Sequence, residues 1–301
     1  MKDTFVTSAL FLSVCIIWGT TWMAMEIAVE SIPPIIATGL RFLISAPCIL
    51  LLAKCTGAPL CFPKGQRSFM FAVAVFYFAI PFTLMIVGEQ YISSGLASII
   101  FANMPLAVLA ISMLSLGLRL VPHQLIGLTV AILCLCLILN NELDIGDNND
   151  YSGILALVAA VAIHAVMYVF TQKYGQGIQV LTYNALPSAI AAILLLVVGS
   201  IWEQPQWHLM ETHSLQAVVY LGLIASVGGI VAYFRLNQVT SPFTASLCFL
   251  IFPVVALCLD AWLNNNHLSA WSQQLLAPLF LGIVVAKLNR FPSIRALVRS
   301  K

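Results

Sequence analysis

Residues 238–253 read QVTSPFTASLCFLIFP, and residues 90–105, which lie 148 positions earlier, read QYISSGLASIIFANMP. The two segments share six identical positions, which are Gln90/Gln238, Ser93/Ser241, Ala97/Ala245, Ser98/Ser246, Phe101/Phe249 and Pro105/Pro253. A segment that recurs half the chain's length away predicts that the protein is built from two related halves.

The composition excludes a water-soluble protein. Of the 301 residues, 61% are hydrophobic and only 8% are charged, whereas a soluble domain has about 25% charged residues. Too few polar side chains are present to cover the outer surface of a molecule this size. We therefore expect the lipid bilayer to be the protein's surroundings.

Apolar runs of about 20 residues, the length that crosses a bilayer, recur along the chain. We expect ten all-α spans at residues 6–27, 34–54, 68–88, 92–115, 122–140, 152–172, 180–202, 214–236, 240–263 and 272–289. The first run is too long for a signal-peptide core, so we expect a retained helix. The connectors are too short to hold a soluble domain, which excludes a nucleic-acid-binding module.

Charges orient these spans. If the N-terminus is cytoplasmic and the spans alternate, 12 of the 13 Lys and Arg residues fall in inside segments, and Arg41 falls in a span. The outside segments carry only carboxylates, namely Glu30, Glu89, Glu142, Asp144, Asp147, Asp150, Glu203 and Glu211. Basic residues favour the cytoplasmic side. This predicts a multi-pass protein of the inner (plasma) membrane with both termini in the cytoplasm.

The repeated segments fall in the fourth and ninth spans. An offset of five spans is odd, so the two copies run in opposite directions and form an inverted repeat, a plan common in secondary transporters. We expect a first repeat over 1–140, an external loop over 141–151, a second repeat over 152–289 and a basic cytoplasmic tail over 290–301. The small residues Ser93/Ala97 and Ser241/Ala245, each pair four apart, favour close packing of the fourth span on the ninth.

Two stretches resemble the EamA-type drug/metabolite transporter superfamily. Residues 16–47, IIWGTTWMAMEIAVESIPPIIATGLRFLISAP, resemble its first two helices through Trp18-Gly19, Pro33-Pro34 and Leu40-Arg41-Phe42. Residues 233–257 resemble its eighth and ninth helices through Tyr233-Phe234-Arg235-Leu236, Ala245-Ser246 and Pro253. The family usually carries a Glu in the loops after the fourth and ninth helices, where this chain has Leu118 and Asn266.

The resemblance implies ten helices in a basket and alternating access around a midplane cavity. It also implies export of a small-molecule substrate, such as an amino acid, a related metabolite or a drug. It does not choose among these substrates.

Pro105 and Pro253 lie about twelve residues into their spans. A proline leaves the carbonyl four residues earlier without its donor, so we expect kinks that free the carbonyls of Phe101 and Phe249. In a membrane such carbonyls must face protein or a wet cavity. The kinks therefore suit a central substrate site, although a bend that serves only packing is the alternative. Asn103, beside Pro105, is a candidate ligand or an interhelical hydrogen bonder.

Arg41 and His164 are ionisable residues deep within predicted spans. Arg41 needs a partner there, and Glu26 or Asp260 is the candidate. Arg41 is either a structural residue or the group that binds a substrate carboxylate. His164 is either a hydrogen-bonded packing residue or a group for proton coupling or substrate contact. Tyr168 lies one turn from His164 on the same helical face.

Aromatic residues near the midplane predict a hydrophobic cavity, because interfacial aromatics would lie at span ends instead. With the residues above, the candidate cavity contains Trp18, Trp22, Arg41, Tyr77, Phe101, Asn103, His164, Tyr168, Tyr233 and Phe249. Plain packing is the alternative for each aromatic. The first span has no carboxylate at its centre, which disfavours the proton antiport of small multidrug transporters.

Other classes fit less well. The eight cysteines lie mostly in apolar runs without metal-ligand spacing, so we expect no metal, cofactor or disulfide. An intramembrane enzyme acting on a lipid-linked substrate would need clustered His, Asp or Glu, and a channel would need a ring of polar groups. Both remain alternatives to a transporter, and the protein can be a monomer or a homodimer.

Overall fold

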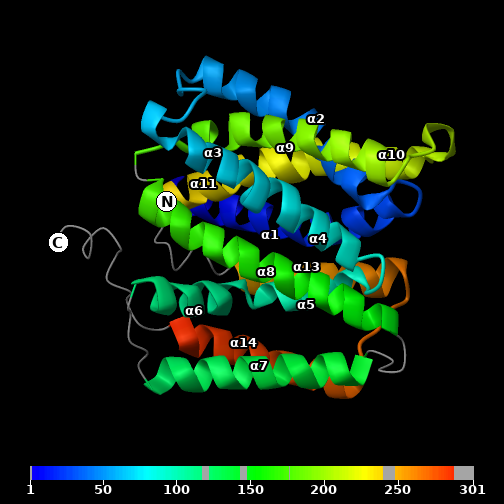
Figure 1. Ribbon diagram of the computed structural model, residues 1–301. Helices are drawn as coiled ribbons and strands as arrows, with labels where there is room; N and C mark the ends of the chain where they lie inside the picture. The colour runs from blue at the N-terminus through cyan, green and yellow to red at the C-terminus, as the bar shows by residue number, and fades with distance from the viewer. Residues whose placement is uncertain (1, 117–121, 143–147, 176, 240–247, 288–301) are drawn as a thin grey trace.

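The computed structural model describes residues 2–116, 122–142, 148–175, 177–239 and 248–287, and these residues form helices and connecting loops without a strand (Figure 1). The elements are α1 (Lys2–Val29), α2 (Pro34–Cys55), η1 (Lys64–Gln66), α3 (Arg67–Val73), η2 (Ala74–Ala79), α4 (Ile80–Gly88), α5 (Ser94–Ala102), α6 (Met104–Leu116), α7 (Pro122–Glu142), α8 (Asn148–Tyr174), α9 (Val180–Trp202), η3 (Trp207–Leu209), α10 (Thr212–Tyr220), η4 (Leu221–Gly228), α11 (Gly229–Val239), α13 (Cys248–Leu263) and α14 (Ala270–Lys287).

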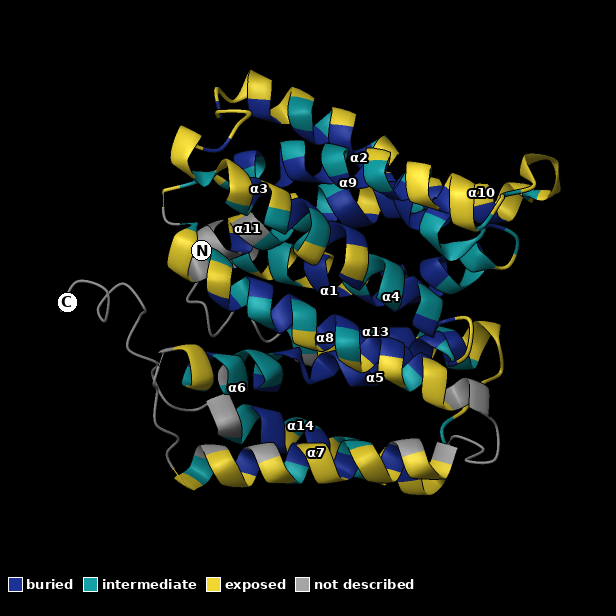
Figure 2. Cartoon of the chain, viewed as in Figure 1, coloured by how far each residue is buried: buried dark blue, intermediate teal, exposed yellow. Residues whose placement is uncertain are grey.

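Seven segments are long and apolar enough to cross a bilayer. They are Val6–Val29, Pro34–Cys55, Lys64–Gly88, Ser94–Ser115, Tyr151–Thr171, Val180–Trp202 and Thr212–Tyr233, and three shorter apolar helices cover Leu125–Ile138, Ile251–Leu263 and Ala270–Val285. Large apolar side chains such as Leu114, Leu155 and Ile201 are exposed on the outer faces (Figure 2). A surface of this kind suits hydrocarbon, so the chain is a multi-pass membrane protein.

Helix α5 forms the centre of the bundle. All nine of its residues are buried, as expected of a helix that is apolar on every side. It packs against α13 and α1, and α1 also packs on α13. The fourth and ninth spans therefore contact each other, but Ser241 and Ala245, which favoured this packing, lie outside the described residues.

Helices α2 and α9 form a second close, antiparallel pair. A Cβ added to Gly39 would lie 3.0 Å from the Leu196 side chain, and one added to Gly199 would lie 2.8 Å from Ile36. Residue 36 thus meets residue 199, and residue 39 meets residue 196, which requires opposite directions. Helix α14 packs on α7 in a third pair at the edge of the bundle (Figure 1).

Three of the expected spans are not regular α-helices throughout. The third and eighth spans each contain a π-helical segment, η2 and η4. The fourth span is broken at Asn103, where α5 ends and α6 begins. Pro105 follows that break and explains it, because proline cannot continue the α-helical hydrogen bonds of the preceding turn.

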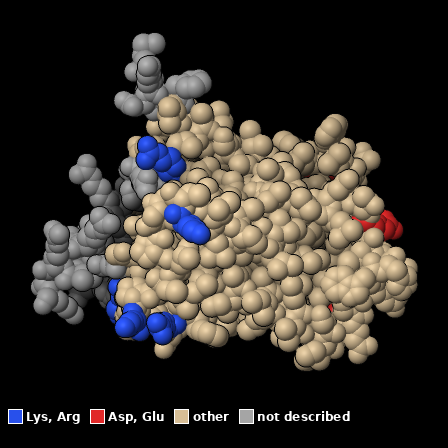
Figure 3. Space-filling view, turned by 90° about the horizontal axis from the view of Figure 1, so that it is seen from above, with Lys and Arg blue, Asp and Glu red and all other residues tan. Residues whose placement is uncertain are grey.

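Charge separates the two ends of the bundle. Figure 3 shows Lys and Arg side chains at one end and Asp and Glu side chains at the opposite end. We call the first the basic end, which includes Lys54, Lys64, Arg67, Lys173 and Arg235, and the second the acidic end, which includes Glu30, Glu203 and Glu211.

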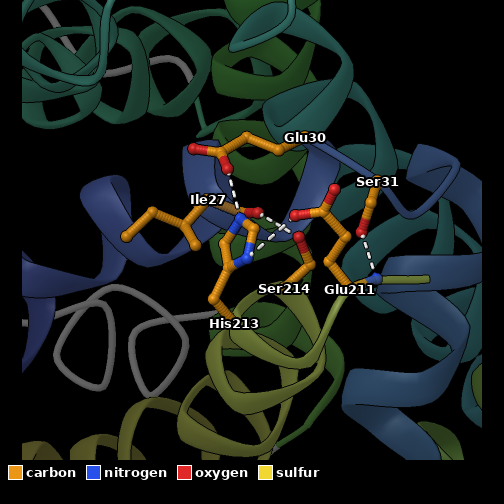
Figure 4. Close-up of polar contacts among 6 residues, drawn as sticks. All are labelled: Ile27, Glu30, Ser31, Glu211, His213 and Ser214. Carbon is orange, nitrogen blue, oxygen red and sulfur yellow. Dashed lines mark hydrogen bonds and ion pairs between the residues drawn. The ribbon is translucent and has the colours of Figure 1, made fainter. Parts of the chain in front are cut away.

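Polar contacts close the acidic end between the first and second halves of the chain. Glu203 accepts hydrogen bonds from the backbone N–H groups of Ile35 and Ile36 at the start of α2, at 2.9 and 3.0 Å. A group that we call the His213 clasp joins the end of α1 to the start of α10 (Figure 4); it consists of Ile27, Glu30, Ser31, Glu211, His213 and Ser214.

Candidate functional site

A cavity of about 110 Å³ lies between the helices of the bundle. A single water needs only about 10–15 Å³ of such space, so the cavity can hold part of a small organic molecule. Its walls are mostly aromatic, and the lining residues are Trp18, Thr21, Trp22, Arg41, Phe42, Tyr77, Phe78, Phe82, Met85, Phe101, Met104, His164, Tyr168, Ala225, Ser226, Ile230, Phe249 and Phe252.

Eight of the ten residues proposed from the sequence line this cavity. They are Trp18, Trp22, Arg41, Tyr77, Phe101, His164, Tyr168 and Phe249. Tyr233 instead lies behind Trp18, with ring centroids 4.7 Å apart. The Asn103 amide donates back to the Ile99 carbonyl at 3.0 Å, so this side chain is engaged within its own helix.

The two prolines lie next to lining residues but act differently. Pro105 follows the break at Asn103, whereas Pro253 lies inside the continuous helix α13. Backbone N–H groups at the C-terminal cap of α5 donate to the Ile100 and Phe101 carbonyls. The expectation that the Phe101 carbonyl is unpaired was therefore wrong, because the helix ends with a capped turn rather than a simple kink.

Arg41 is the cation of the cavity. Its Nε donates to Ser226 Oγ at 2.9 Å, its Nη1 approaches Met25 Sδ at 3.7 Å, and its guanidinium carbon lies 4.7 Å from the centre of the Phe82 ring. The side chain is 5% exposed. No carboxylate forms an ion pair with it within the part of the chain that the structure describes.

The carboxylates expected to pair with Arg41 bind the start of α5 instead, which corrects that expectation. Glu26 accepts from the Ser94 N–H at 3.2 Å and from Asn264 Nδ2 at 2.8 Å. Asp260 accepts from the Gly95 N–H at 3.1 Å and from the side chains of Asn264 and Asn266. Carboxylates at a helix N-terminus satisfy its free N–H groups and its positive dipole end.

Arg41 can therefore bind an anion in the cavity. A guanidinium has five N–H donors in a planar fork that matches a carboxylate, and it stacks well on aromatic rings. Only Nε is engaged by a protein oxygen among the described residues. Arg41 lines a cavity whose walls are mostly aromatic, an arrangement that suits a carboxylate attached to an apolar body.

His164 is held by a backbone carbonyl. Its Nε2 lies 3.1 Å from the Tyr77 carbonyl oxygen, and since a carbonyl only accepts, Nε2 carries the proton. Pro81, four residues after Tyr77, has no N–H to offer that carbonyl. His164 therefore gives that carbonyl a donor that residue 81 cannot supply, which supports the packing alternative while leaving its ring on the cavity wall.

The π-helical segments were not predicted from the sequence, and both contribute to the cavity wall. Segment η2 supplies Tyr77 and Phe78, and η4 supplies Ala225 and Ser226, which lie 148 positions later. π-Turns often occur at functional sites. The 148-residue offset itself was the signal that could have located Ser226.

Glu89 follows the end of α4, in the connector that the sequence analysis expects to be external, but its burial was not predicted. It is only 5% exposed, and neither of its carboxylate oxygens has a hydrogen-bond partner among the described residues. Glu89 caps the C-terminal end of α4, a helix that packs against α8, α2 and α1.

The chain is similar to known transporters over nearly its whole length. The model of the EamA-like transporter family matches residues 6–140 and again residues 151–288. Protein PagO of Salmonella typhimurium is 46% identical over 283 residues, covering 94% of this chain and 93% of that protein. The inner membrane transporter YedA of Escherichia coli K12 is 26% identical, covering 92% of this chain and 89% of YedA.

A solved crystal structure has a similar fold. Its TM-score to this chain is 0.68 at 18% sequence identity, and the match covers 96% of this chain and 98% of the other. At that identity the likeness concerns the fold alone.

Proposed function

Because the chain belongs to the EamA-like transporter family, we propose that it is an inner-membrane exporter of small carboxylate-bearing metabolites, such as amino acids with apolar side chains. The observation that carries the substrate class is the buried guanidinium of Arg41 on the wall of an aromatic cavity. The transporter role itself follows from the family and from relatives that are named transporters.

We propose that the chain forms ten transmembrane helices in two inverted halves, residues 1–140 and 152–289. Two matches of one family model along the chain support this. Three contacting pairs of helices, α2 with α9, α5 with α13, and α7 with α14, come from spans related by the 148-residue offset. Corresponding elements meet at a twofold axis, and α2 and α9 run antiparallel, as inversion requires.

Alternating access around the cavity is the mechanism that this arrangement supports. The two halves rock about a fixed central site, and opening one end closes the other. The structure is closed at the acidic end by Glu203 and the His213 clasp. Both contacts join residues of opposite halves, so rocking of the halves would break or form them.

The acidic end faces outward in this proposal. Support comes from the charge separation in Figure 3, because basic residues favour the cytoplasmic side of a membrane. Helix α1 begins at the basic end, which puts the N-terminus in the cytoplasm (Figure 1).

Binding to the purified protein tests the substrate class. Trp18 and Trp22 line the cavity, so an occupant should change tryptophan fluorescence. We expect some of a panel of apolar and aromatic amino acids to cause a saturable change, and their amide derivatives, which lack the carboxylate, to cause none.

Arg41→Lys should weaken that binding. The variant keeps the charge but loses the planar fork, and a hydrogen bond to a charged group is worth about 1.5–3 kcal/mol, or roughly 10- to 100-fold in affinity. Arg67→Lys, at the basic end, is the matched control and should bind as the wild type does. Equal affinity for acids and amides would contradict the proposal, and turnover of a lipid-linked compound would favour the intramembrane-enzyme alternative.

A further inference from the structure

Glu89 is a buried carboxyl group with no hydrogen-bond donor. It follows the last residue of the span Lys64–Gly88, and the whole residue is 5% exposed. Oε1 and Oε2 both lack a hydrogen-bond partner among the described residues. An ionised carboxylate in such a place would be unstable, because burial removes its water and nothing replaces those hydrogen bonds.

The groups around Glu89 disfavour a negative charge there. Glu26 on α1 and Asp260 on α13 act on it as neighbouring charges, and both are already bound to the N-terminus of α5. Arg41 on α2 is the one cation that acts on it, and its effect is weaker. From α8 the residues that meet this end of α4 are apolar, with Leu157 against Gly88 and Gly153 against Tyr91 and Ile92.

The pKa of Glu89 follows from these surroundings. Burial raises it well above the ordinary value for a glutamate, and the two nearby carboxylates raise it further. Glu26 and Asp260 differ from Glu89 because each accepts backbone and amide hydrogen bonds. The backbone of Glu26 and the cation Arg41 lower the pKa of Glu89, but these effects are weaker than those of burial and of the two carboxylates.

We propose that Glu89 is the proton-binding site of this transporter, holding an exchangeable proton while the acidic end is closed and releasing it when that end opens to water. The role in coupling rests on the proposed transport function, whereas the protonated carboxyl group itself does not. Nothing but a proton is transferred, from the Glu89 carboxyl oxygen to water.

Glu89 lies close both to the substrate cavity and to the acidic end of the bundle. Met85, one helical turn earlier on the same face of α4, lines the cavity. Glu26, which acts on Glu89 as a neighbouring charge, also accepts a hydrogen bond from Asn264 and so joins α1 to the end of α13. Opening of the acidic end would separate these groups and let water reach Glu89. A neutral Glu89 also leaves Arg41 free to bind a substrate anion.

Infrared spectroscopy of the full-length protein in lipid tests the site without a substrate. A protonated carboxyl group absorbs apart from a carboxylate. We expect the wild type to retain a protonated-carboxyl band at neutral pH, and Glu89→Gln to lose it. Glu30→Gln, which removes an exposed carboxylate of the His213 clasp, should leave the band unchanged. Glu26→Gln should keep the band but shift its titration to lower pH, because one of the repelling charges is gone.

Thermal unfolding over a pH series gives a second readout. A group whose folded pKa is raised stabilises the fold below its unfolded pKa, and that stability is lost as pH rises through the folded pKa. Wild-type Tm should therefore fall over a pH range in which the Tm of Glu89→Gln stays flat.

The proposal is overturned if Glu89→Gln keeps the full band, or if the wild type shows none at neutral pH. Loss of the wild-type band on adding sodium ions at constant pH would also overturn it, because the site would then bind a metal cation. A protein that shows the band but transports nothing would contradict the proposed function and leave the proton site intact.

Discussion

His164 shows how one residue can serve both the fold and the cavity. Its ring donates to the Tyr77 carbonyl, which cannot accept from residue 81 because that residue is a proline. It also faces Phe101 and Tyr168 on the cavity wall, at ring-centroid distances of 6.1 and 6.0 Å. Its packing role and any contact with substrate are therefore separable only by a substitution that restores the hydrogen bond.

His164→Ala should lower the stability of the protein by about 1–3 kcal/mol, the usual effect of leaving a buried polar group without its partner. Adding Pro81→Ala should recover part of that loss, because residue 81 then has an N–H four residues after Tyr77. Thermal melts of the two single variants and the double variant give the interaction energy. The expectation is contradicted if the stability changes of the two single variants simply add in the double variant. In that case the N–H of residue 81 does not replace the His164 ring as the donor to the Tyr77 carbonyl.

Most cavity residues could be predicted from the sequence because aromatic side chains away from span ends have few other places to go. Phe101 and Trp22 are examples, with ring centroids 5.0 Å apart. The partners of Arg41 and the burial of Glu89 could not be predicted. They depend on which helices pack together at the acidic end, and that packing leaves no pattern in the local sequence.

At the scale of single elements, the interruptions of helices matter most for the cavity. Helix α5 ends at Ala102 and α6 begins at Met104, which lines the cavity. The sequence predicts a kink from Pro105, but a proline does not reveal whether the helix bends or stops. In the structure the helix stops, and the Asn103 backbone N–H closes the last turn of α5 on the Ile100 carbonyl at 3.2 Å.

Pro105→Ala should impair transport more than folding. The variant gains a backbone N–H and favours a continuous helix through Asn103, which would move Met104 and stiffen a joint between α5 and α6. We expect a small change in Tm and a clear loss of flux in vesicles. Pro47→Ala in α2, whose proline lies outside the cavity lining, is the matched control. Normal flux in Pro105→Ala would show that the break serves packing alone.

The His213 clasp should bias the protein toward closure of the acidic end. His213 Nε2 contacts Glu30 Oε2 at 2.5 Å and Nδ1 contacts Glu211 Oε2 at 3.2 Å. Exposed pairs of this kind are worth about 0.2–1 kcal/mol. His213→Ala should therefore raise the ratio of open to closed molecules by up to about fivefold.

Spin-label distances between the end of α1 and the start of α10 would measure that shift. His208→Ala is the control, since His208 belongs to the neighbouring segment η3 and not to the clasp. An unchanged distance distribution in His213→Ala would show that the clasp does not influence opening.

At the scale of the whole molecule, the pattern of apolar runs predicted the helical fold, because each span must satisfy its backbone internally. Expected runs at 34–54 and 180–202 agree closely with α2 and α9. The π-helical segments inside the third and eighth spans could not be predicted, since hydropathy reports how apolar a segment is and not its hydrogen-bond pattern.

Labelling of introduced cysteines tests the orientation in the membrane. A membrane-impermeant thiol reagent added to intact cells should reach a cysteine at Glu211, at the acidic end, and not one at Arg67, at the basic end. The labelling is done in a background without the exposed native cysteines Cys55, Cys61, Cys136 and Cys258. Labelling at Arg67 without labelling at Glu211 would reverse the orientation and make the basic end external.

Flux through the reconstituted protein tests the substrate site at Arg41 most directly. Proteoliposomes would be loaded with a panel of labelled amino acids and related acids, and efflux would be followed for the wild type, Arg41→Gln and the control Arg67→Gln. We expect saturable efflux of carboxylates with apolar bodies from the wild type and the control, and its loss in Arg41→Gln with the fold retained in a thermal melt. Equal efflux from Arg41→Gln and the wild type would contradict the assignment of the aromatic cavity as the substrate site.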